Sequence, residues 1–568
     1  MFRKTPVSHP GGWVSEIFFG GFLSHVSGCR EGKKVKTGFV KIIRKFPGRT
    51  VLAIFMGALS FLCFSQESWA GSREHLFYPS SSPQYASQLD IESVAMSFWG
   101  NNLLLSDTRH EVVFLNISGE NMTVPVSGGK DLVNQVVLPG QAVVVAGNGH
   151  SAPLPEIRPG KAFHFGILPL GMAVDKDIVF IADGNGTIDA LNISMDPRHI
   201  YVIPPIGNTG AIRGHVTRMI QRTGLNNRVL GEAAPLTLLS GRISVIAGGG
   251  DKRPGIKPID AFSCRISPVA IANDGHRIYV VGQTGRVYFL NEARHVVDIP
   301  VKENGKTRWV HVPTGMIVLV AGGGTKNTDV DLVPLSAVES EIAPTSIAVH
   351  HHHILLGDSG DGVLEVNVAG DHQQILKSDS ANLHPLEPGE IVSVTGSGNQ
   401  MADTKPMEAS LVDIHPKSLV ESASGILYLA EMDETSDAGK VEALNVGSAD
   451  VSVPQGGAPH GLTRLPHGQV MVLVGNGSKT PVPGIRPDIP THVGIVPVNV
   501  AFHNGLLAIA DLNGSIDVVN IGGVNRLVHP MGQGSAVVLP RGRIISLMGA
   551  RSGNRSKGEL VPEVHSGQ

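Results

Sequence analysis

The sequence is poor in charge, in aromatic rings and in cysteine. Charged residues make up 17% of its 568 residues and aromatic residues 5%, and there are three cysteines. So little charge excludes an intrinsically disordered protein or a coiled coil, and three cysteines exclude a scaffold built on disulfides. The longest apolar run, residues 51–64, is also shorter than the ~20 residues that a membrane-spanning helix needs.

Basic residues are scarce after position 70. Residues 1–70 hold ten Lys and Arg against three Asp and Glu, so the rest holds 36 basic against 46 acidic residues, a formal charge of −10. With no basic stripe in that part, we expect no nucleic-acid partner. It keeps a single cysteine, Cys264, which excludes an internal disulfide and a cysteine-based zinc site, and we expect this thiol to be buried.

The first 70 residues have the pattern of a secretory signal. Seven Lys and Arg between positions 33 and 49 precede the apolar run, and the small residues Ser68 and Ala70 follow it. This predicts export, secreted or periplasmic, with cleavage after Ala70; an uncleaved segment would instead anchor the chain in a membrane. Residues 1–34 exceed the usual length, which indicates either a start codon downstream or an extended leader.

One phrase, a short apolar strand ending on glycines, returns along the chain. It reads VVVAGNG at 143–149, SVIAGGG at 244–250, VLVAGGG at 318–324, VSVTGSG at 392–398 and MVLVGNG at 471–477, with the weaker ISLMGAR at 545–551. A turn containing Gly precedes each copy. The phrase therefore predicts the last strand of a repeating unit.

A second phrase precedes each of these strands, and it has three alternating apolar runs, as in GMAVDKDIVFIADGNGTIDALN at 171–192. Such a pattern is typical of a three-stranded antiparallel meander. Every copy ends on Asn, and successive Asn residues are 76, 99, 76, 78 and 75 positions apart: Asn116, Asn192, Asn291, Asn367, Asn445 and Asn520. Nine positions before the Asn, four copies have Asp, namely Asp107, Asp183, Asp358 and Asp511.

Six units of four antiparallel strands predict an all-β fold, a six-bladed β-propeller of four-stranded blades. Packing blade on blade buries both faces of each sheet, and closing the ring protects the sheet edges. We place the propeller at residues 91–549, after a lead-in at 71–90 and before a disordered polar tail at 550–568.

The phrase at 143–192, with its strand ending in Ala-Gly, then Pro-x-Gly, Val-Asp and Ile-Ala-Asp, resembles the NHL repeat of secreted bacterial-type proteins. The resemblance extends over roughly residues 91–549, with longer loops than usual. It implies a six-bladed propeller. It also implies, because such propellers include metal-dependent enzymes, an alternative function as a zinc- or calcium-dependent lyase or hydrolase.

The repeated Asp and Asn residues allow two interpretations. They could form a ring of carboxylates for a metal ion, or each could cap a turn within its own blade. Equal repetition around a ring favours the structural role, because a functional site normally breaks the symmetry.

Three segments break the repeat. The run His350–His353 offers imidazoles for zinc, and since side chains alternate along a strand we take His350 and His352 as candidate ligands; the alternative is a solvated turn. The insertion at 207–240 has arginines and the pattern of a short amphipathic helix, which would contact a partner or ligand; the alternative is a solvated excursion. The acidic insertion beginning at Glu431 has oxygen ligands suited to calcium, without the spacing of a known calcium loop.

No catalytic motif is present. The sequence has no HExxH and no nucleophile elbow, and no helical pattern follows the Gly-x-Gly words, as a phosphate-binding loop requires. The sequence therefore favours a rigid scaffold that binds an unidentified protein or small ligand, with no assured cofactor and zinc or calcium as the possible ones.

Overall fold

The computed structural model describes residues 80–85, 91–128, 131–152, 159–203, 234–328, 333–350, 352–360, 362–370, 373–376, 383–395, 398–433, 438–455, 461–478, 482, 486–530 and 535–548. The chain divides into two units, Met1–Trp69 and Ala70–Gln568, and all described residues belong to the second. The expected signal segment, the polar tail and residues 207–233 of the insertion lie outside the described residues.

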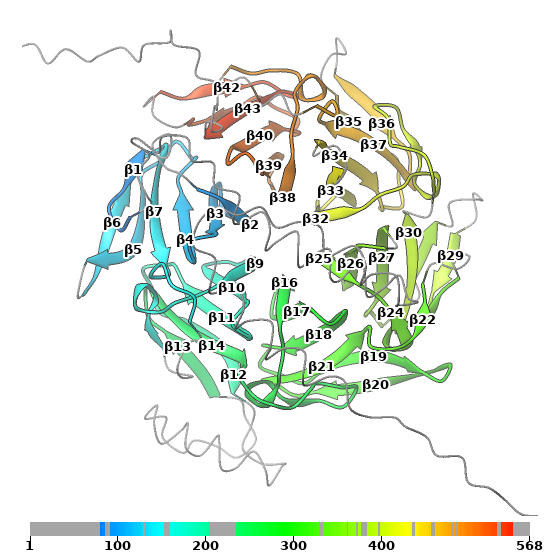
Figure 1. Cartoon of the computed structure of the whole chain (residues 1–568). Helices are drawn as coiled ribbons and strands as arrows, with labels where there is room; N and C mark the ends of the chain where they lie inside the picture. Colours follow the sequence, from blue (N-terminus) through cyan, green and yellow to red (C-terminus); the bar gives the residue numbers. More distant parts are fainter. Residues whose placement is uncertain are drawn as a thin grey trace, which may run out of the picture. The chain divides into compact units, whose positions relative to one another are not determined.

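The second unit is a six-bladed β-propeller, as the sequence predicts (Figure 1). The first strand of each blade is innermost: β2 (Ser93–Trp99), β9 (Pro169–Asp175), β16 (Pro268–Asp274), β25 (Pro344–His350), β32 (Pro416–Glu421) and β38 (Pro497–His503). Each first strand contacts the first strand of the next blade, and β2 contacts β38. The ring is therefore closed.

The second and third strands of each blade form the rest of the predicted meander. The second strands are β3 (Asn102–Asp107), β10 (Ile178–Asp183), β17 (Arg277–Gly282), β26 (His353–Asp358), β33 (Ile426–Asp433) and β39 (Leu506–Asp511). The third strands are β4 (Glu111–Leu115), β11 (Thr187–Asn192), β18 (Arg286–Asn291), β27 (Gly362–Asn367), β34 (Ala438–Asn445) and β40 (Ile516–Asn520).

The glycine-ended phrase is the fourth strand of each blade, which confirms the prediction. These strands are β7 (Gln141–Ala146), β14 (Arg242–Gly248), β21 (Met316–Ala321), β30 (Glu390–Thr395), β37 (Gln469–Val474) and β43 (Ile544–Met548). The glycine is required because it has a positive φ and lies against a neighbouring turn: at Gly248 φ is 94°, and a Cβ atom would be 2.4 Å from the carbonyl oxygen of Gly186.

Five of the six blades have a fifth strand that the sequence did not predict. It consists of two residues that precede the blade and pair with its fourth strand: β1 (Gln84–Tyr85), β8 (Gly160–Lys161), β15 (Ile259–Asp260), β23 (Leu335–Ser336) and β31 (Met407–Glu408). In the sixth blade a single bridge between Asp488 and Ile544 takes this place. The predicted four-stranded blade is thus extended by one short edge strand, which partly covers the edge of the outer strand.

Short 3-10 helices follow these edge positions and lead into the next innermost strand. They are η5 (Ala162–His164), η6 (Ala261–Ser263), η7 (Ala337–Glu339), η8 (Ala409–Leu411) and η9 (Pro490–His492). A two-residue parallel ladder, β22 (Lys326–Asn327) with β24 (Ser340–Glu341), braces one of these connectors. Each helix contacts the fourth strand of the preceding blade, so the connectors tie neighbouring blades together.

In every blade a two-stranded hairpin lies between the third and the fourth strand. The sequence predicted four strands per blade, so these hairpins are a further difference. The pairs are β5 (Met122–Gly128) with β6 (Asp131–Val137), β12 (Arg198–Ile203) with β13 (Ala234–Leu238), β19 (Val297–Glu303) with β20 (Lys306–Val312), β28 (Gln373–Leu376) with β29 (Leu383–Leu386), β35 (Val451–Pro454) with β36 (Leu462–Leu465) and β41 (Arg526–Val528) with β42 (Val537–Leu539). The hairpins lie at the outer rim in Figure 1.

The antiparallel order of the strands gives the propeller two different ends. The turns between first and second strands and the hairpins lie at one end, which we name the hairpin side. The turns between second and third strands and the connectors lie at the other, the connector side.

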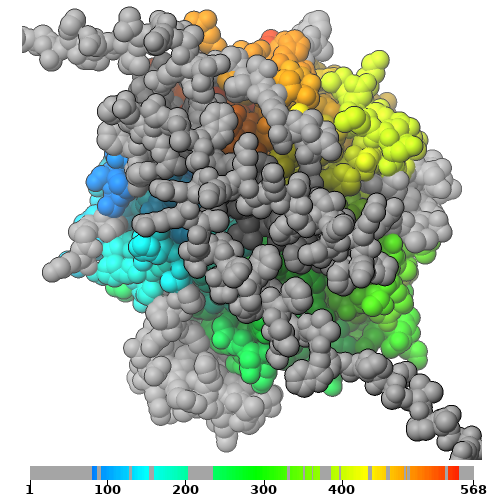
Figure 2. All heavy atoms as spheres, viewed as in Figure 1, coloured from blue at the N-terminus to red at the C-terminus, as the bar shows by residue number. Residues whose placement is uncertain are grey.

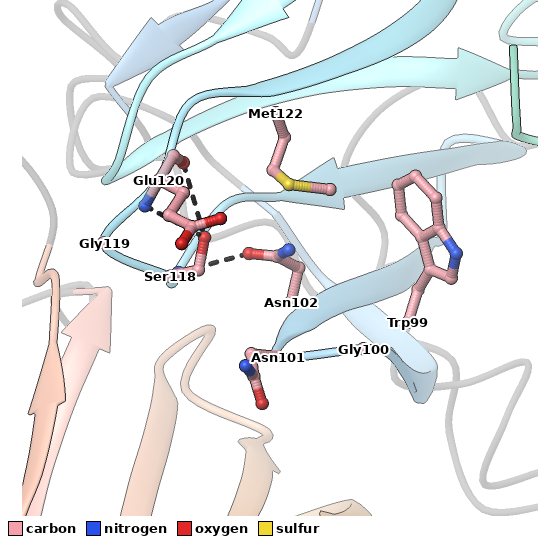
Figure 3. A pocket seen from close by; sticks show the side chains of 8 residues that line it. All are labelled: Trp99, Gly100, Asn101, Asn102, Ser118, Gly119, Glu120 and Met122. Atoms are coloured by element: carbon pink, nitrogen blue, oxygen red, sulfur yellow. Dashed lines mark hydrogen bonds between the residues drawn. The ribbon is translucent and has the colours of Figure 1, made fainter.

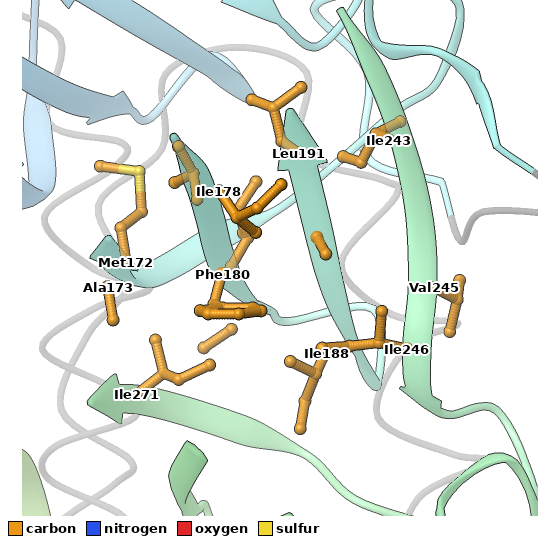
Figure 4. Packing of buried hydrophobic residues seen from close by; sticks show 14 of the residues in the cluster. Met172, Ala173, Ile178, Phe180, Ile188, Leu191, Ile243, Val245, Ile246 and Ile271 are labelled. Carbon is orange, nitrogen blue, oxygen red and sulfur yellow. The ribbon is translucent and has the colours of Figure 1, made fainter. Parts of the chain in front are cut away.

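The hydrophobic core lies between the blades. Figure 4 shows Phe180 and Ile188 of the second blade pointing towards Ile271 of the third. Another cluster joins the first and last blades, with Leu105 packed in the same group as Ala508 and Val518. Each blade is one continuous segment, and the colours in Figure 2 follow chain order around the ring, so apolar packing closes the ring without exchange of a strand.

Candidate functional site

The repeated aspartates each bind the backbone of their own blade. Asp183 accepts hydrogen bonds from the backbone N–H groups of Asn185 (2.8 Å) and Leu168 (3.0 Å), and Asp358 and Asp511 make the corresponding pairs of bonds. Asp107 accepts from the backbone N–H of Arg109 and forms an ion pair with its side chain at 2.7 Å. Each carboxylate thus holds the turn after a second strand.

The six repeated asparagines hold the base of the hairpins. In every blade the Nδ2 group donates to the carbonyl of the last residue of the returning hairpin strand, and the residue that accepts is Val137, Leu238, Val312, Leu386, Leu465 or Leu539. The Oδ1 atom accepts from a backbone N–H two residues further along the chain in all six. All six asparagines are fully buried.

The histidine run lies at the first turn of the fourth blade. His352, with a φ of 68°, places its Nδ1 atom 2.7 Å from a carboxylate oxygen of Asp274 in the third blade, and His353 places its Nδ1 3.0 Å from Glu365. His350 ends β25, and its side chain is not described. Within the described ranges no three or more His, Cys, Asp or Glu side chains form a group that could hold a metal ion.

A partly buried cluster where the fourth and fifth blades adjoin had no signal in the repeat pattern. Glu421 ends β32, and burial, followed by the nearby Glu365, raises its pKa to about 8. Both ring nitrogens of His467 are enclosed and make no hydrogen bond within the described part of the chain, and burial lowers the pKa of this ring. The cluster is a set of acids and bases whose pKa values are perturbed by burial.

A pocket with a volume of about 380 Å³ lies on the hairpin side of the first blade (Figure 3). Its lining comes from the first turn and from the start of the hairpin: Trp99, Gly100, Asn101, Asn102, Ser118, Gly119, Glu120 and Met122. The indole N–H of Trp99 donates to Asp177 at 3.1 Å, and Asn102 accepts from the backbone N–H groups of Ile117 and Ser118. These bonds fix two walls of the pocket.

The pocket adjoins the last blade. A Cβ atom on Gly119 would be 3.4 Å from Nε2 of His529, and the backbone N–H of His529 donates to the carbonyl of Ile117. We name this region, where His529 after β41 lies against the segment that leads into β5, the closing seam. No other blade has a tryptophan at the end of its first strand, so the site breaks the six-fold repeat.

Exposed apolar side chains gather on the segments between the third and fourth strands. In the first and last blades they are Val133, Val136, Leu138, Val524, Leu527 and Val538. Leu527 and Val538 are opposite each other across β41 and β42 and are 66% and 51% exposed. Their side chains share one face of that hairpin, because directly opposed residues in an antiparallel pair do so.

Cys264 is buried, as expected. Its Sγ atom donates to the carbonyl of Ala261 at 2.9 Å, and burial raises its pKa to about 12. The thiol is therefore chemically inert. Among the described residues, no helix has the length and apolar character that would let it span a membrane.

No family model matches this sequence, and no curated protein does. The resemblance to the NHL repeat therefore stays a prediction. Solved structures similar in fold include a protein of unknown function from Bacteroides thetaiotaomicron, at 12% identity and a TM-score of 0.37, with 77% of this chain and 72% of that chain covered. Another is BamB from Moraxella catarrhalis, at 11% identity and a TM-score of 0.28, with 81% and 90% covered. Likenesses at this level say nothing about activity.

Proposed function

We propose that this chain is an exported propeller that acts as a rigid scaffold and binds a protein through the closing seam. The observation that carries the proposal is the exposed apolar pair Leu527 and Val538 on β41–β42, a hairpin in which the residue after β41, His529, lies against the segment that lines the asymmetric pocket described above. Apolar groups that gather in this way mark interaction surfaces on soluble proteins.

The seam combines two features of protein-binding surfaces. Burying its apolar side chains against a partner is favourable by roughly 25 cal/mol for each Å² of apolar surface removed from water. The pocket adds the partly buried indole ring of Trp99 and the exposed carboxylate of Glu120. A pocket lined by these two groups is suited to receive one side chain of a partner. Export rests on the predicted signal and cleavage after Ala70.

The test compares three forms of the full chain as bait in extracts of the producing cells. In the seam variant Leu527→Ser/Val538→Ser the paired apolar residues are removed. In the matched control Met401→Ser/Leu411→Ser, two exposed apolar residues in the connector before the fifth blade are removed. Both should fold like the wild type, since surface changes of this kind alter stability by roughly 0.5 kcal/mol or less.

The expected result is a partner retained by the wild type and the control and lost from the seam variant. Equal retention of the partner by all three forms would contradict the proposed surface. Loss of the partner from the control alone would also contradict it, and would place the binding surface on the connector side instead.

A further inference from the structure

Two buried carboxylates of the second blade share one face of the sheet. Asp183 ends β10 and is paired with Thr187, and Asp189 in β11 is paired with Ile181. Directly opposed residues, and residues two apart on one strand, point to the same face, so Asp183, Thr187 and Asp189 lie together. Both aspartates are fully buried, and Thr187 is 4% exposed.

Four oxygen atoms of this group receive no hydrogen bond from the rest of the described chain, while inside the group Asp189 interacts with Asp183 and Thr187. They are Oδ2 of Asp183, Oγ1 of Thr187, and both Oδ1 and Oδ2 of Asp189. The other oxygen of Asp183 is occupied by the two backbone N–H groups that hold the turn. Enclosing carboxylates without a counter-charge is strongly unfavourable, because burial removes their hydration and nothing compensates the charge.

The fifth blade shows how the same arrangement is neutralised elsewhere in this chain. Glu431 is paired with Pro416 as Asp183 is with Pro169, and Glu442 lies three residues before the repeated Asn, as Asp189 does. Between the two glutamates, the ammonium of Lys440 lies 3.0 Å from Glu431 and 2.8 Å from Glu442.

The residue that corresponds to Lys440 in the second blade is Thr187. Each lies five residues before the repeated Asn. The first blade, where Asp107 is paired with Arg109, also supplies a cation of its own. We propose that a calcium ion, held by Asp183, Thr187 and Asp189, takes the position in the second blade that the Lys440 ammonium takes in the fifth.

The donor atoms define the class of cation. Carboxylate and hydroxyl oxygens suit hard cations such as Ca²⁺ and Mg²⁺. Mg²⁺ usually keeps several of its waters and requires near-octahedral geometry, whereas Ca²⁺ accepts irregular sets of oxygen ligands, so Ca²⁺ fits better among buried side chains. The half-buried turn Gly184–Gly186 joins Asp183 to Thr187 on the connector side of the group.

The sixth blade provides a natural comparison. It repeats the motif Asp-x-Asn-Gly-Ser/Thr-Ile-Asp, as Asp511 to Asp517 against Asp183 to Asp189. There both oxygens of Asp511 accept backbone N–H groups, and Ser515 donates to Asp517 at 3.2 Å. Within the part of the chain that the structure describes, Oδ1 of Asp517 is the one carboxylate oxygen of this pair without a partner, so the proposal concerns the second blade alone.

The experiment measures the thermal midpoint of the full chain, stripped with a chelator, as Ca²⁺ is added. We expect a rise of at least about 2 °C at saturating Ca²⁺, and a smaller rise with Mg²⁺. Asp189→Asn should abolish the rise with Ca²⁺, and the matched variant Asp517→Asn should keep it.

A second variant places the ammonium of the fifth blade into the second. Thr187→Lys should raise the midpoint of the metal-free chain and remove its response to Ca²⁺, an outcome that a misfolded variant cannot produce. The proposal is overturned if Ca²⁺ leaves the wild type unchanged, or if Asp189→Asn still responds to Ca²⁺ as the wild type does. An unresponsive wild type combined with a higher midpoint of Asp189→Asn would show that the two carboxyls share a proton instead.

Discussion

The side chain of Asn192 donates to the carbonyl of Leu238, 46 residues further along the chain, at 2.8 Å. In the other five blades the same bond spans only 19 to 21 residues, at 2.7 to 3.0 Å. One buried amide therefore fixes the base of each hairpin, whatever the length of the segment between the Asn and the residue whose carbonyl accepts its bond. This explains how the second blade accommodates its long insertion while its sheet keeps the pattern of the others.

Replacing this amide should destabilise the protein. Asn192→Ala removes both donated bonds and the acceptor for Ser194, and takes the buried donor away from the carbonyl of Leu238. We expect a loss of about 2–4 kcal/mol in the free energy of unfolding, measured in urea. Asn134→Ala, at an exposed position of β6, is the control and should change stability by less than about 0.5 kcal/mol. A loss of equal size in both variants would contradict the role of Asn192.

Lys440 should be indispensable in the fifth blade. Its substitution by Met leaves Glu431 and Glu442 facing each other, with Glu442 fully buried. We expect a destabilisation of about 3–5 kcal/mol in urea at pH 7. Lys306→Met, an exposed lysine of β20, should have little effect. A Lys440→Met protein as stable as the wild type would show that the two glutamates carry protons there.

The sixth blade predicts a pH dependence of stability. Burial, followed by the nearby Asp511, raises the pKa of Asp517 from 3.8 to about 8. Since the folded state binds this proton more tightly than the unfolded state, the stabilisation is complete below about pH 4 and is lost as the pH rises towards 8. Asp517→Asn does not titrate, so it should exceed the wild type in stability at pH 8, by at least about 1 kcal/mol, and converge with it towards pH 4. Parallel pH curves for the two proteins would contradict this account.

Export predicts a defined new amino terminus. The mass of the protein recovered outside the cytoplasm should correspond to a chain beginning at Gly71, because Ser68 and Ala70 supply the small side chains that signal cleavage requires. Ala70→Arg should block processing and leave a heavier chain. Recovery of the unprocessed wild-type mass would instead support an anchored segment.

The architecture could be predicted from sequence because its signals are local and repeated. The Asn residues mark the end of every third strand and the glycine phrase marks every fourth strand. The rim hairpins were not predicted, although the one in the third blade has a recognisable signal, Asn304-Gly305 between alternating apolar residues with φ values of 51° and 73°. The edge strands have two residues each, too few to show any periodicity.

The candidate sites were harder to predict from the sequence than the fold. The closing seam joins segments more than 400 residues apart, so nothing local in the sequence indicates that Gly119 and His529 are neighbours. The buried partners Asp189 and Asp517 did have a signal, the motif shared by only two of the six units. For the histidine run the structure gives single acidic neighbours, Asp274 for His352 and Glu365 for His353, and a zinc site there stays a prediction.

The most direct test of the closing seam as the binding surface is site-specific photo-crosslinking in the producing cells. A photoreactive amino acid replaces Leu527 on the seam in one form of the chain and Met401 on a connector in another, both exposed in the wild type. The proposed function predicts a discrete, heavier adduct from position 527 and none from position 401. Adducts only from position 401, or none from position 527, would contradict it.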